Sequence, residues 1–329
     1  MPPRHWLSQS HPVAILLRPA AWVFGRLRAL RERLYNFKIL KTHKLSVPTI
    51  VVGNVVAGGV GKTPLVITLV QRLLHMGYQP GVVSRGYGRK SKRCQIVTGH
   101  STVAEVGDEP LLITRICQVP MAVASNRVQA AKTLLAAHPE CNVLVSDDGL
   151  QHLALGRDIE IVLFDERGVG NNWLIPAGPL REPYPRKPRC RAHLVLSDVS
   201  RSLASYALDE NGQQYELSTL VDQTLHALAG IAKPDTFFQM LRDQGLTLAS
   251  THSYADHQDF VKSNMESNLA ANPSVIWLCT EKDSIKLWPL YPRYAHRILA
   301  VPLTLDLDQT FLSVFDVTIQ SLMQQSKKM

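Results

Sequence analysis

A short apolar run, Val47–Val52, leads directly into a glycine-rich stretch, Gly53–Gly61, and then into Lys62 and Thr63. From Thr63 to His75 the apolar residues recur at helical spacing. A strand that passes through a glycine-rich loop into a helix presents successive backbone N–H groups to phosphate oxygens. The order of strand, loop and helix therefore predicts a phosphate-binding loop at one edge of a parallel sheet.

The residue types in this loop suit a nucleotide. Lys62 can bridge the β- and γ-phosphates of ATP, and the hydroxyl of Thr63 can reach Mg²⁺. The common pattern GxxxxGKT would place glycine at position 56, where this chain has Val56. A glycine-rich turn with a chance lysine is the competing interpretation, and the flanking strand and helix argue against it. The residues expected to bind the nucleotide are Gly58, Gly59, Val60, Gly61, Lys62, Thr63 and Pro64.

A second apolar run, Val143–Ser146, ends at two adjacent acids, Asp147 and Asp148. Neighbouring carboxylates repel each other, and a bound cation would stabilise them. An acid at the end of a buried strand is also the usual metal-supporting partner of a phosphate loop. We therefore expect a Mg²⁺ site here; a solvated turn after the strand is the alternative.

The rest of the chain alternates continuous apolar runs with helical patterns. This alternation predicts an α/β fold of the phosphate-loop NTPase type, in which helices cover both faces of a mostly parallel sheet. The chain becomes polar over residues 200–223, and strand and helix patterns then resume. We expect three parts: a basic N-terminal helical segment (1–45), a phosphate-loop core (46–220) and a smaller C-terminal α/β domain (221–329).

The net charge of +9 is concentrated at the N-terminus. The first 45 residues hold nine basic residues and one acidic residue, so eight of the nine net positive charges lie there. The near-neutral remainder argues against a nucleic-acid-binding surface. Five cysteines are dispersed without metal-binding spacing, which favours a reducing, cytosolic compartment.

Residues 20–38 have the pattern of an amphipathic helix. Val23, Leu27, Leu30, Leu34 and Phe37 fall on one helical face, and several arginines lie beside or opposite it. No apolar run is long enough to span a bilayer. One interpretation is a helix that lies on an anionic membrane. The other is a surface helix that packs on its own domain, and the pattern alone does not decide between them.

A third candidate site is Asp108 with Glu109, at the start of a predicted helix. The pattern alone favours an ordinary helix cap for Asp108. His152 and His257 are each, taken alone, more typical of structural histidines than of catalysts. Arg127 and Arg181 are candidates for phosphate contacts.

Taken in order, the motifs resemble those of the tetraacyldisaccharide 4′-kinase family of lipid A synthesis. They are GNVVAGGVGKTP from Gly53, SRGYGRK from Ser84, GDEP from Gly107, SDDGLQH from Ser146 and PAGPLREP from Pro176, followed by Asp256-His257 and TEKD from Thr280. The resemblance covers nearly the whole chain.

The resemblance implies a kinase that uses ATP and Mg²⁺ to phosphorylate the 4′-hydroxyl of an acylated disaccharide 1-phosphate. Asp108 would be the catalytic acid–base residue, paired with His257 or, as the alternative, with His252. Lys62 and Arg181 would hold transferred phosphate charge, with Glu182 beside Arg181 and Arg127 in a substrate or phosphate contact. Thr63, Glu109, Asp147 and Asp148 would serve Mg²⁺.

The resemblance also implies a location. The N-terminal helix would lie on the cytoplasmic face of the inner membrane, as a peripheral or monotopic anchor, and present the lipid to the site. We expect neither nucleic acid nor an obligate protein partner.

Three rival functions follow from parts of the pattern. A nucleotide switch of the ParA or metallochaperone type shares GGxGKT, but usually has lysine before the paired glycines, where this chain has Ala57. A nucleic-acid-binding ATPase would need a basic surface beyond residue 45. A non-catalytic membrane scaffold would leave Lys62 and the acid pair unexplained.

Overall fold

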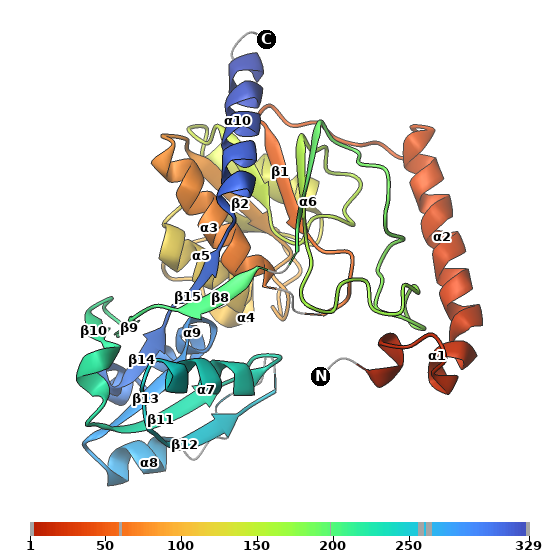
Figure 1. The fold of residues 1–329 in the computed structure, drawn as a ribbon. Helices are drawn as coiled ribbons and strands as arrows, with labels where there is room; N and C mark the ends of the chain where they lie inside the picture. Colours follow the sequence, from red (N-terminus) through yellow and green to blue (C-terminus); the bar gives the residue numbers. More distant parts are fainter. Residues whose placement is uncertain (1–2, 59–60, 198, 256–259, 261–264, 327–329) are drawn as a thin grey trace.

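The computed structural model describes residues 3–58, 61–197, 199–255, 260 and 265–326. Two α/β units lie one above the other in Figure 1, and a long helix stands at the side of the first. That helix is α2 (Arg18–Asn36), preceded by η1 (Arg4–Trp6) and α1 (Pro12–Leu16). None of the helices in the described part of the chain has the length and apolarity needed to cross a membrane.

The first unit is built on a seven-stranded sheet with the order β3-β4-β2-β5-β1-β6-β7. All neighbouring strands are parallel except the edge strand β3, which is antiparallel to β4. The strands are β1 (Thr49–Gly53), β2 (Pro80–Ser84), β3 (Gln95–Val97), β4 (Met121–Val123), β5 (Val143–Ser146), β6 (Ile159–Leu163) and β7 (Ala192–Leu196).

Helices cover this sheet on both faces. The crossovers through α3 and α5 run in one direction along the strand order, and the crossover through α6 runs back. Because such crossovers are right-handed, α6 lies on the face opposite α3 and α5. The helices of this unit are α3 (Lys62–His75), α4 (Val103–Val106), α5 (Asp108–Cys117), α6 (Arg127–Ala137) and α10 (Gln309–Ser326).

The second unit has a six-stranded mixed sheet with the order β10-β9-β14-β13-β11-β12. Its strands are β9 (Tyr206–Leu208), β10 (Gln214–Glu216), β11 (Thr224–Ala229), β12 (Leu248–Ser253), β13 (Val275–Thr280) and β14 (Ile298–Val301). Its helical segments are η2 (Leu217–Leu220), α7 (Pro234–Asp243), α8 (Met265–Ala271), α9 (Glu281–Leu290) and η4 (Pro292–Arg297). The antiparallel pair β8 (Ser200–Leu203) and β15 (Leu303–Asp306) carries the chain between the units.

The predicted division at residue 220 differs from this arrangement in two respects. Strands β9 and β10 come before residue 221 but belong to the second sheet. Helix α10 comes after it, yet Phe315 and Ile319 of α10 are buried in the core of the first unit. The chain therefore enters the second unit near residue 204 and returns to the first at its C-terminal helix.

The sheet order explains why two distant motifs meet. Strand β1 lies between β5 and β6, and Val51 of β1 is in register with Ser146 of β5. Because neighbouring parallel strands end at the same edge, the loop after β1 and the acids after β5 lie side by side.

Candidate active site

The loop that follows β1 has the backbone geometry of a tight phosphate loop. Gly58 and Gly61 have φ values of +110° and +85°, which side chains other than glycine rarely adopt. A Cβ at Gly61 would also lie 2.8 Å from the guanidinium of Arg201. Gly59 and Val60 of the predicted nucleotide-binding set lie outside the described residues, while Thr63 and Pro64 lie in the first turn of α3.

Lys62 begins α3 and points back toward the loop. Its Nζ lies 3.3 Å from Oδ1 of Asn54 and 3.8 Å from Oδ1 of Asp148. Arg181, from the long loop after β6, donates to the same two oxygens at 3.0 Å each. The structure thus brings together three predicted residues, Lys62, Asp148 and Arg181, around an asparagine that the prediction omitted.

The two adjacent acids have different environments. Asp148 has a φ of +45° and turns toward the cations. Burial alone would raise the pKa of Asp148, but Lys62 and Arg181 together hold it below its ordinary value. Asp147 is buried, and its Oδ2 accepts a hydrogen bond from Ser84 at 3.0 Å.

Asp147 has the properties of a cation ligand. Its burial, reinforced by the nearby Glu109 and Asp148 carboxylates, raises its pKa to about 7. Its Oδ1 is buried and has no hydrogen-bond partner in the part of the chain that the structure describes. A buried carboxylate oxygen without a donor, close to two further acids, is a suitable ligand for Mg²⁺.

Asp108 lies at the first residue of α5, and Gly107, not Asp108, occupies the N-cap position. Oδ1 of Asp108 accepts a hydrogen bond from the backbone N of Glu109 at 3.0 Å. Its Oδ2 lies 3.1 Å from Nζ of Lys286, which belongs to α9 of the second unit. The carboxylate is 2% exposed, which is more burial than a simple surface helix start requires.

Arg127 and Glu182 border the same region. Arg127 is buried, and its guanidinium donates to the carbonyls of Ala124 at 3.2 Å and of Asp148 at 3.4 Å. Burial lowers the pKa of Arg127 to about 10. Oε2 of Glu182 lies 2.6 Å from Nη2 of Arg28 in α2, so Glu182 ties the N-terminal helix to the loop that carries Arg181.

The structure describes two of the three candidate histidines, His252 and His152. His257 lies outside the described residues. His252, the alternative, bonds Ser250 at 2.9 Å and packs against the rings of His226 and Trp277 in the second sheet. His152 accepts a hydrogen bond from the backbone N of Arg127 at 3.2 Å, and burial lowers its pKa to about 4. His152 is therefore a neutral structural residue.

Four residues at the site were not singled out from the sequence: Asn54, Arg167, Arg201 and Lys286. Nη1 of Arg167 lies 3.5 Å from the carbonyl of Ala57, and Arg167 is itself held by Asp165. Asn54, inside the glycine-rich loop, and Lys286, three residues after TEKD, had positions in the sequence that could have marked them. Arg167 and Arg201 come from segments without a motif of their own and reach the site through the fold.

Among the described residues, one group of three acid, cysteine and histidine side chains brings its ligand atoms within 4.8 Å of one another: Glu160, Cys190 and His193. Arg157 and Arg186 already lie 3.0 and 2.9 Å from the Glu160 carboxylate. Burial raises the pKa of the Cys190 thiol to about 11, so the thiol stays protonated. We therefore assign no metal to this group.

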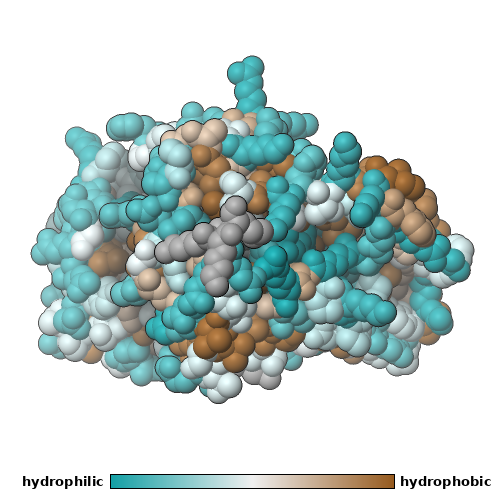
Figure 2. Space-filling model, turned by 90° about the horizontal axis from the view of Figure 1, so that it is seen from above, coloured by the Kyte–Doolittle hydropathy of each residue, from teal (hydrophilic) through white to brown (hydrophobic). Residues whose placement is uncertain are grey.

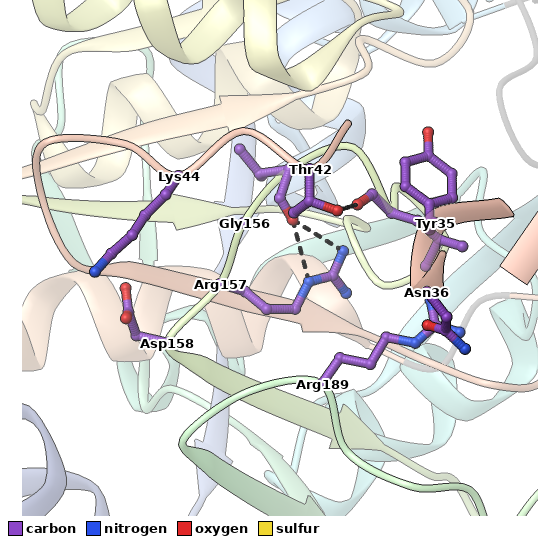
Figure 3. A pocket seen from close by; sticks show the side chains of 10 residues that line it. Tyr35, Asn36, Thr42, Lys44, Gly156, Arg157, Asp158 and Arg189 are labelled. Carbon is purple, nitrogen blue, oxygen red and sulfur yellow. Dashed lines mark hydrogen bonds between the residues drawn. The ribbon is translucent and has the colours of Figure 1, made fainter. Parts of the chain in front are cut away.

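We also assign no catalytic function to a pocket near the C-terminal end of α2. Figure 3 shows it between Tyr35 and Asn36 on one side and Lys44 and Arg157 on the other. The guanidinium of Arg157 is engaged by the carbonyls of Leu150 at 2.9 Å and of His152 at 2.8 Å. Its cation therefore serves the fold of the loop after β5.

A largely apolar cavity of about 390 Å³ joins α2 to the phosphate loop region. Phe24, Leu27 and Arg31 of α2 line it on one side, and Arg181 lines it on the other. The predicted stripe on α2 is mostly exposed, with Leu27 63% and Phe37 75% accessible, so the helix does not bury it on its own domain. Figure 2 shows a hydrophobic patch at the edge of the molecule where α2 lies.

The comparisons with known proteins agree with this geometry. The family model "Tetraacyldisaccharide-1-P 4'-kinase" matches residues 13–320. The chain belongs to this family. It is 46% identical to the tetraacyldisaccharide 4'-kinase of Acidovorax sp. (strain JS42) over 94% of this chain and 92% of the relative. The corresponding enzyme of Polaromonas sp. (strain JS666 / ATCC BAA-500) is also 46% identical, over 98% and 97%.

A solved structure shows the same fold. The "apo" form of LpxK from Aquifex aeolicus, in complex with ATP, superposes with a TM-score of 0.79 and 27% identity. The match covers 94% of this chain and 99% of that one. The predicted family, kinase activity and α/β fold class are confirmed, which leaves the rival switch, nucleic-acid-binding and scaffold interpretations without support.

Proposed function

We propose that this kinase transfers the γ-phosphate of ATP to the 4′-hydroxyl of a tetraacyldisaccharide 1-phosphate. The observation that carries the proposal is the convergence of Lys62, Arg181 and the two acids on one phosphate loop, beside an apolar cavity that leads to α2. The names of the relatives and the ATP complex of the Aquifex protein support the same substrates.

Within this proposal the cations act on the transferred phosphate. Lys62 and Arg181 now share Asp148 and Asn54, and both can turn to the β- and γ-phosphates while the loop N–H groups hold the rest of the chain of phosphates. Charge that spreads over the γ-phosphate oxygens in the transition state is thereby neutralised. Arg127, buried behind Asp148, adds positive potential to the same region.

Thr63, Glu109, Asp147 and Asp148 would hold Mg²⁺. When bound, the ion would neutralise charge on the β- and γ-phosphates. Oδ1 of Asp147 has no hydrogen-bond partner among the described residues, and the pKa of Asp147 is raised. Both observations support Asp147 as a ligand of the ion. Lys62 keeps Asp148 ionised. When the nucleotide binds, Asp148 would exchange part of its contact with Lys62 for contacts within the nucleotide complex.

Asp108 would accept the proton of the acceptor. As the 4′-oxygen bonds to the γ-phosphorus, the bond between that phosphorus and the β–γ bridging oxygen breaks, and ADP leaves. The hydroxyl proton passes to the carboxylate of Asp108, with His257 as the partner that would share this proton. Asp108 belongs to the first unit, and His257 lies in the sequence between β12 and α8 of the second, so both units would contribute to one site.

The lipid would approach from α2. The exposed apolar face of this helix and its arginines fit the interface of an anionic membrane, on the cytoplasmic face of the inner membrane. The cavity between α2 and Arg181 would then admit the sugar headgroup while the acyl chains remain in the bilayer.

The test is the transfer of labelled γ-phosphate from ATP to a tetraacyldisaccharide 1-phosphate in detergent micelles with Mg²⁺. We expect label in the lipid, at the 4′ position by ³¹P NMR. Hydrolysis of ATP that never labels the lipid would overturn the proposed acceptor.

A further inference from the structure

Two lysines of the second unit meet the carboxylate of Asp108. Nζ of Lys286 lies 3.1 Å from Oδ2 of Asp108, and Nζ of Lys282 lies 3.8 Å from the same oxygen. Lys282 is also 3.9 Å from Oε1 of Glu109. Both lysines are largely buried, with side chains 17% and 15% exposed. This is a built contact between the units, since a surface lysine would leave its ammonium in water.

The fold of the second unit fixes these lysines. Lys282 and Lys286 are four residues apart on α9, so they share one face of the helix. Asp283 faces the other way and is fully buried; it accepts hydrogen bonds from the backbone N of Gly230 at 2.9 Å and from Thr280 Oγ1 at 2.6 Å. The start of α9 is thereby fastened to the end of β11.

The helix that carries Asp108 packs against α9. The guanidinium of Arg115 in α5 lies 4.2 Å from the ring centroid of Trp288 in α9, a cation–π distance. The two helices therefore meet at the Arg115–Trp288 contact and again at the Asp108–Lys286 pair. The position of the second unit is linked to the orientation of the Asp108 carboxylate.

The two oxygens of Asp108 have separate partners. Oδ1 is held by the backbone N of Glu109, and Oδ2 faces Lys286. The contact on Oδ1 comes from α5 itself and the contacts on Oδ2 come from α9, so the orientation of the carboxylate depends on both helices. Asp108 and Lys286 both line a cavity of about 500 Å³ between the units.

We propose that Lys286, with Lys282 beside it, is a positioning residue for the phosphoryl transfer. It holds the carboxylate of Asp108 in the orientation that accepts the acceptor's proton, and it makes this orientation depend on the placement of the second unit. The inference rests on the proposed role of Asp108 and adds a residue outside the phosphate-loop motifs.

The first test compares Lys286→Met with the wild type and with Lys233→Met. Lys233 forms another ion pair between the units, with Glu166, but it is half exposed and away from Asp108. We expect Lys286→Met to lower kcat roughly 10- to 100-fold, as a misplaced catalytic group does, with the KM for ATP changed less than about threefold. Lys233→Met should keep wild-type kcat.

A double-mutant cycle with Asp108→Asn separates positioning from a general structural effect. If Lys286 acts through Asp108, Lys286→Met should lower kcat by less than about twofold in the Asp108→Asn background. The same loss in both backgrounds, or wild-type kcat in Lys286→Met alone, would overturn the inference. Absence of lipid phosphorylation by both the wild type and Lys233→Met would instead contradict the proposed function.

Discussion

At the scale of single residues, the phosphate site is arranged around shared oxygens. Lys62 and Arg181 both contact the same two oxygens, Oδ1 of Asn54 and Oδ1 of Asp148. Each cation is shared between a carboxylate oxygen and an amide oxygen, so both can turn toward an incoming phosphate at small cost. Lys62 is therefore one of the two cations that meet at these oxygens.

Lys62→Ala removes that ammonium. We expect kcat/KM for ATP to fall roughly 100- to 1,000-fold, the usual loss when one preorganised charge at a transition state is deleted. Steady-state kinetics with the lipid acceptor measure this. Lys132→Ala, an exposed lysine on α6, is the matched control and should be unchanged. Full activity in Lys62→Ala would remove the phosphate loop from the mechanism.

His152 gives a prediction on pH and stability. Burial, then the Arg127 and Arg157 cations, lower its pKa to about 4 in the folded chain. An unfolded histidine binds its proton near pH 6.5. Between these values the unfolded chain binds more protons, so this residue makes the free energy of unfolding fall as pH drops from 6.5 to 4. Above pH 6.5 it has no such effect.

His152→Gln keeps a neutral acceptor for the backbone N of Arg127 and cannot be protonated. Urea unfolding at pH 7 and pH 4.5 should show a smaller acid-induced loss in this variant than in the wild type. His100→Gln, at an exposed loop position, should behave as the wild type. Equal acid sensitivity of all three proteins would show that His152 does not carry the effect.

The sequence indicates which site residues lie together only where their motifs follow neighbouring strands. Lys62 and Asp148 come after two neighbouring parallel strands, β1 and β5, which end at the same edge of the sheet. Their proximity could therefore be predicted. Arg201 and Lys286 come from β8 and α9, and their approach depends on how the second unit folds back. No local pattern encodes that approach.

At the scale of elements, α2 is attached to the site through a buried ion pair. Glu182 is 2% exposed and meets Arg28 at 2.6 Å, Arg186 at 3.4 Å and Gln151 at 3.0 Å. These contacts connect the N-terminal helix to the residue that follows Arg181. A displacement of α2 would therefore also displace Glu182 and its neighbour Arg181 at the phosphate site.

Glu182→Ala should be destabilising. It removes one of two carboxylate partners from Arg28 and from Arg186, which keep Glu32 and Glu160, so we expect a loss of about 1–3 kcal/mol. Thermal or urea unfolding measures the loss. Glu216→Ala, exposed on β10 in the second unit, is a control that should change the free energy of unfolding by less than about 0.5 kcal/mol. A comparable loss in both variants would argue against the Glu182 cluster.

Element prediction followed hydrophobic pattern and failed where the pattern is short. The buried strand β5 matches the apolar run Val143–Ser146 residue for residue, and helix α5 begins at Asp108 as predicted. The strands β3, β9 and β10 have three residues each, too few to display a period. Helix α9 contains Pro289 and several charged residues, so its sequence does not show a clear helical pattern.

At the scale of the whole molecule, charge and exposed apolar surface coincide. Eight of nine net charges lie in the first 45 residues, and so do most of the exposed large hydrophobic side chains. Sequence pattern located this segment but could not decide whether its stripe is buried. The structure leaves Val23 and Leu30 about half exposed, because α2 stands beside the first unit and does not cover its core.

Val23→Glu with Leu30→Glu should weaken binding to vesicles that contain anionic phospholipid by roughly tenfold or more, since two apolar contacts are lost and negative charge is added. Binding of the wild type should also weaken as salt rises. Co-sedimentation measures both. Val314→Glu with Val317→Glu, exposed on α10, is the matched control. Equal loss in both pairs would argue against α2 as the membrane contact.

Whole-molecule organisation was the least predictable level. A polar stretch over residues 200–223 suggested a boundary, but β9 and β10 lie within it and belong to the second sheet. The return of α10 to the first core depends on the pairing of β15 with β8, more than 100 residues apart in sequence. Such long-range pairing leaves no local signal.

The central claim is that Asp108 accepts the proton of the lipid hydroxyl. The most direct measurement is kcat and the KM for ATP of Asp108→Ala beside the wild type, with labelled ATP and the tetraacyldisaccharide 1-phosphate in micelles. We predict that kcat falls roughly 100-fold or more while the KM for ATP stays within about threefold. A variant that keeps its kcat and only binds ATP more weakly would contradict the account.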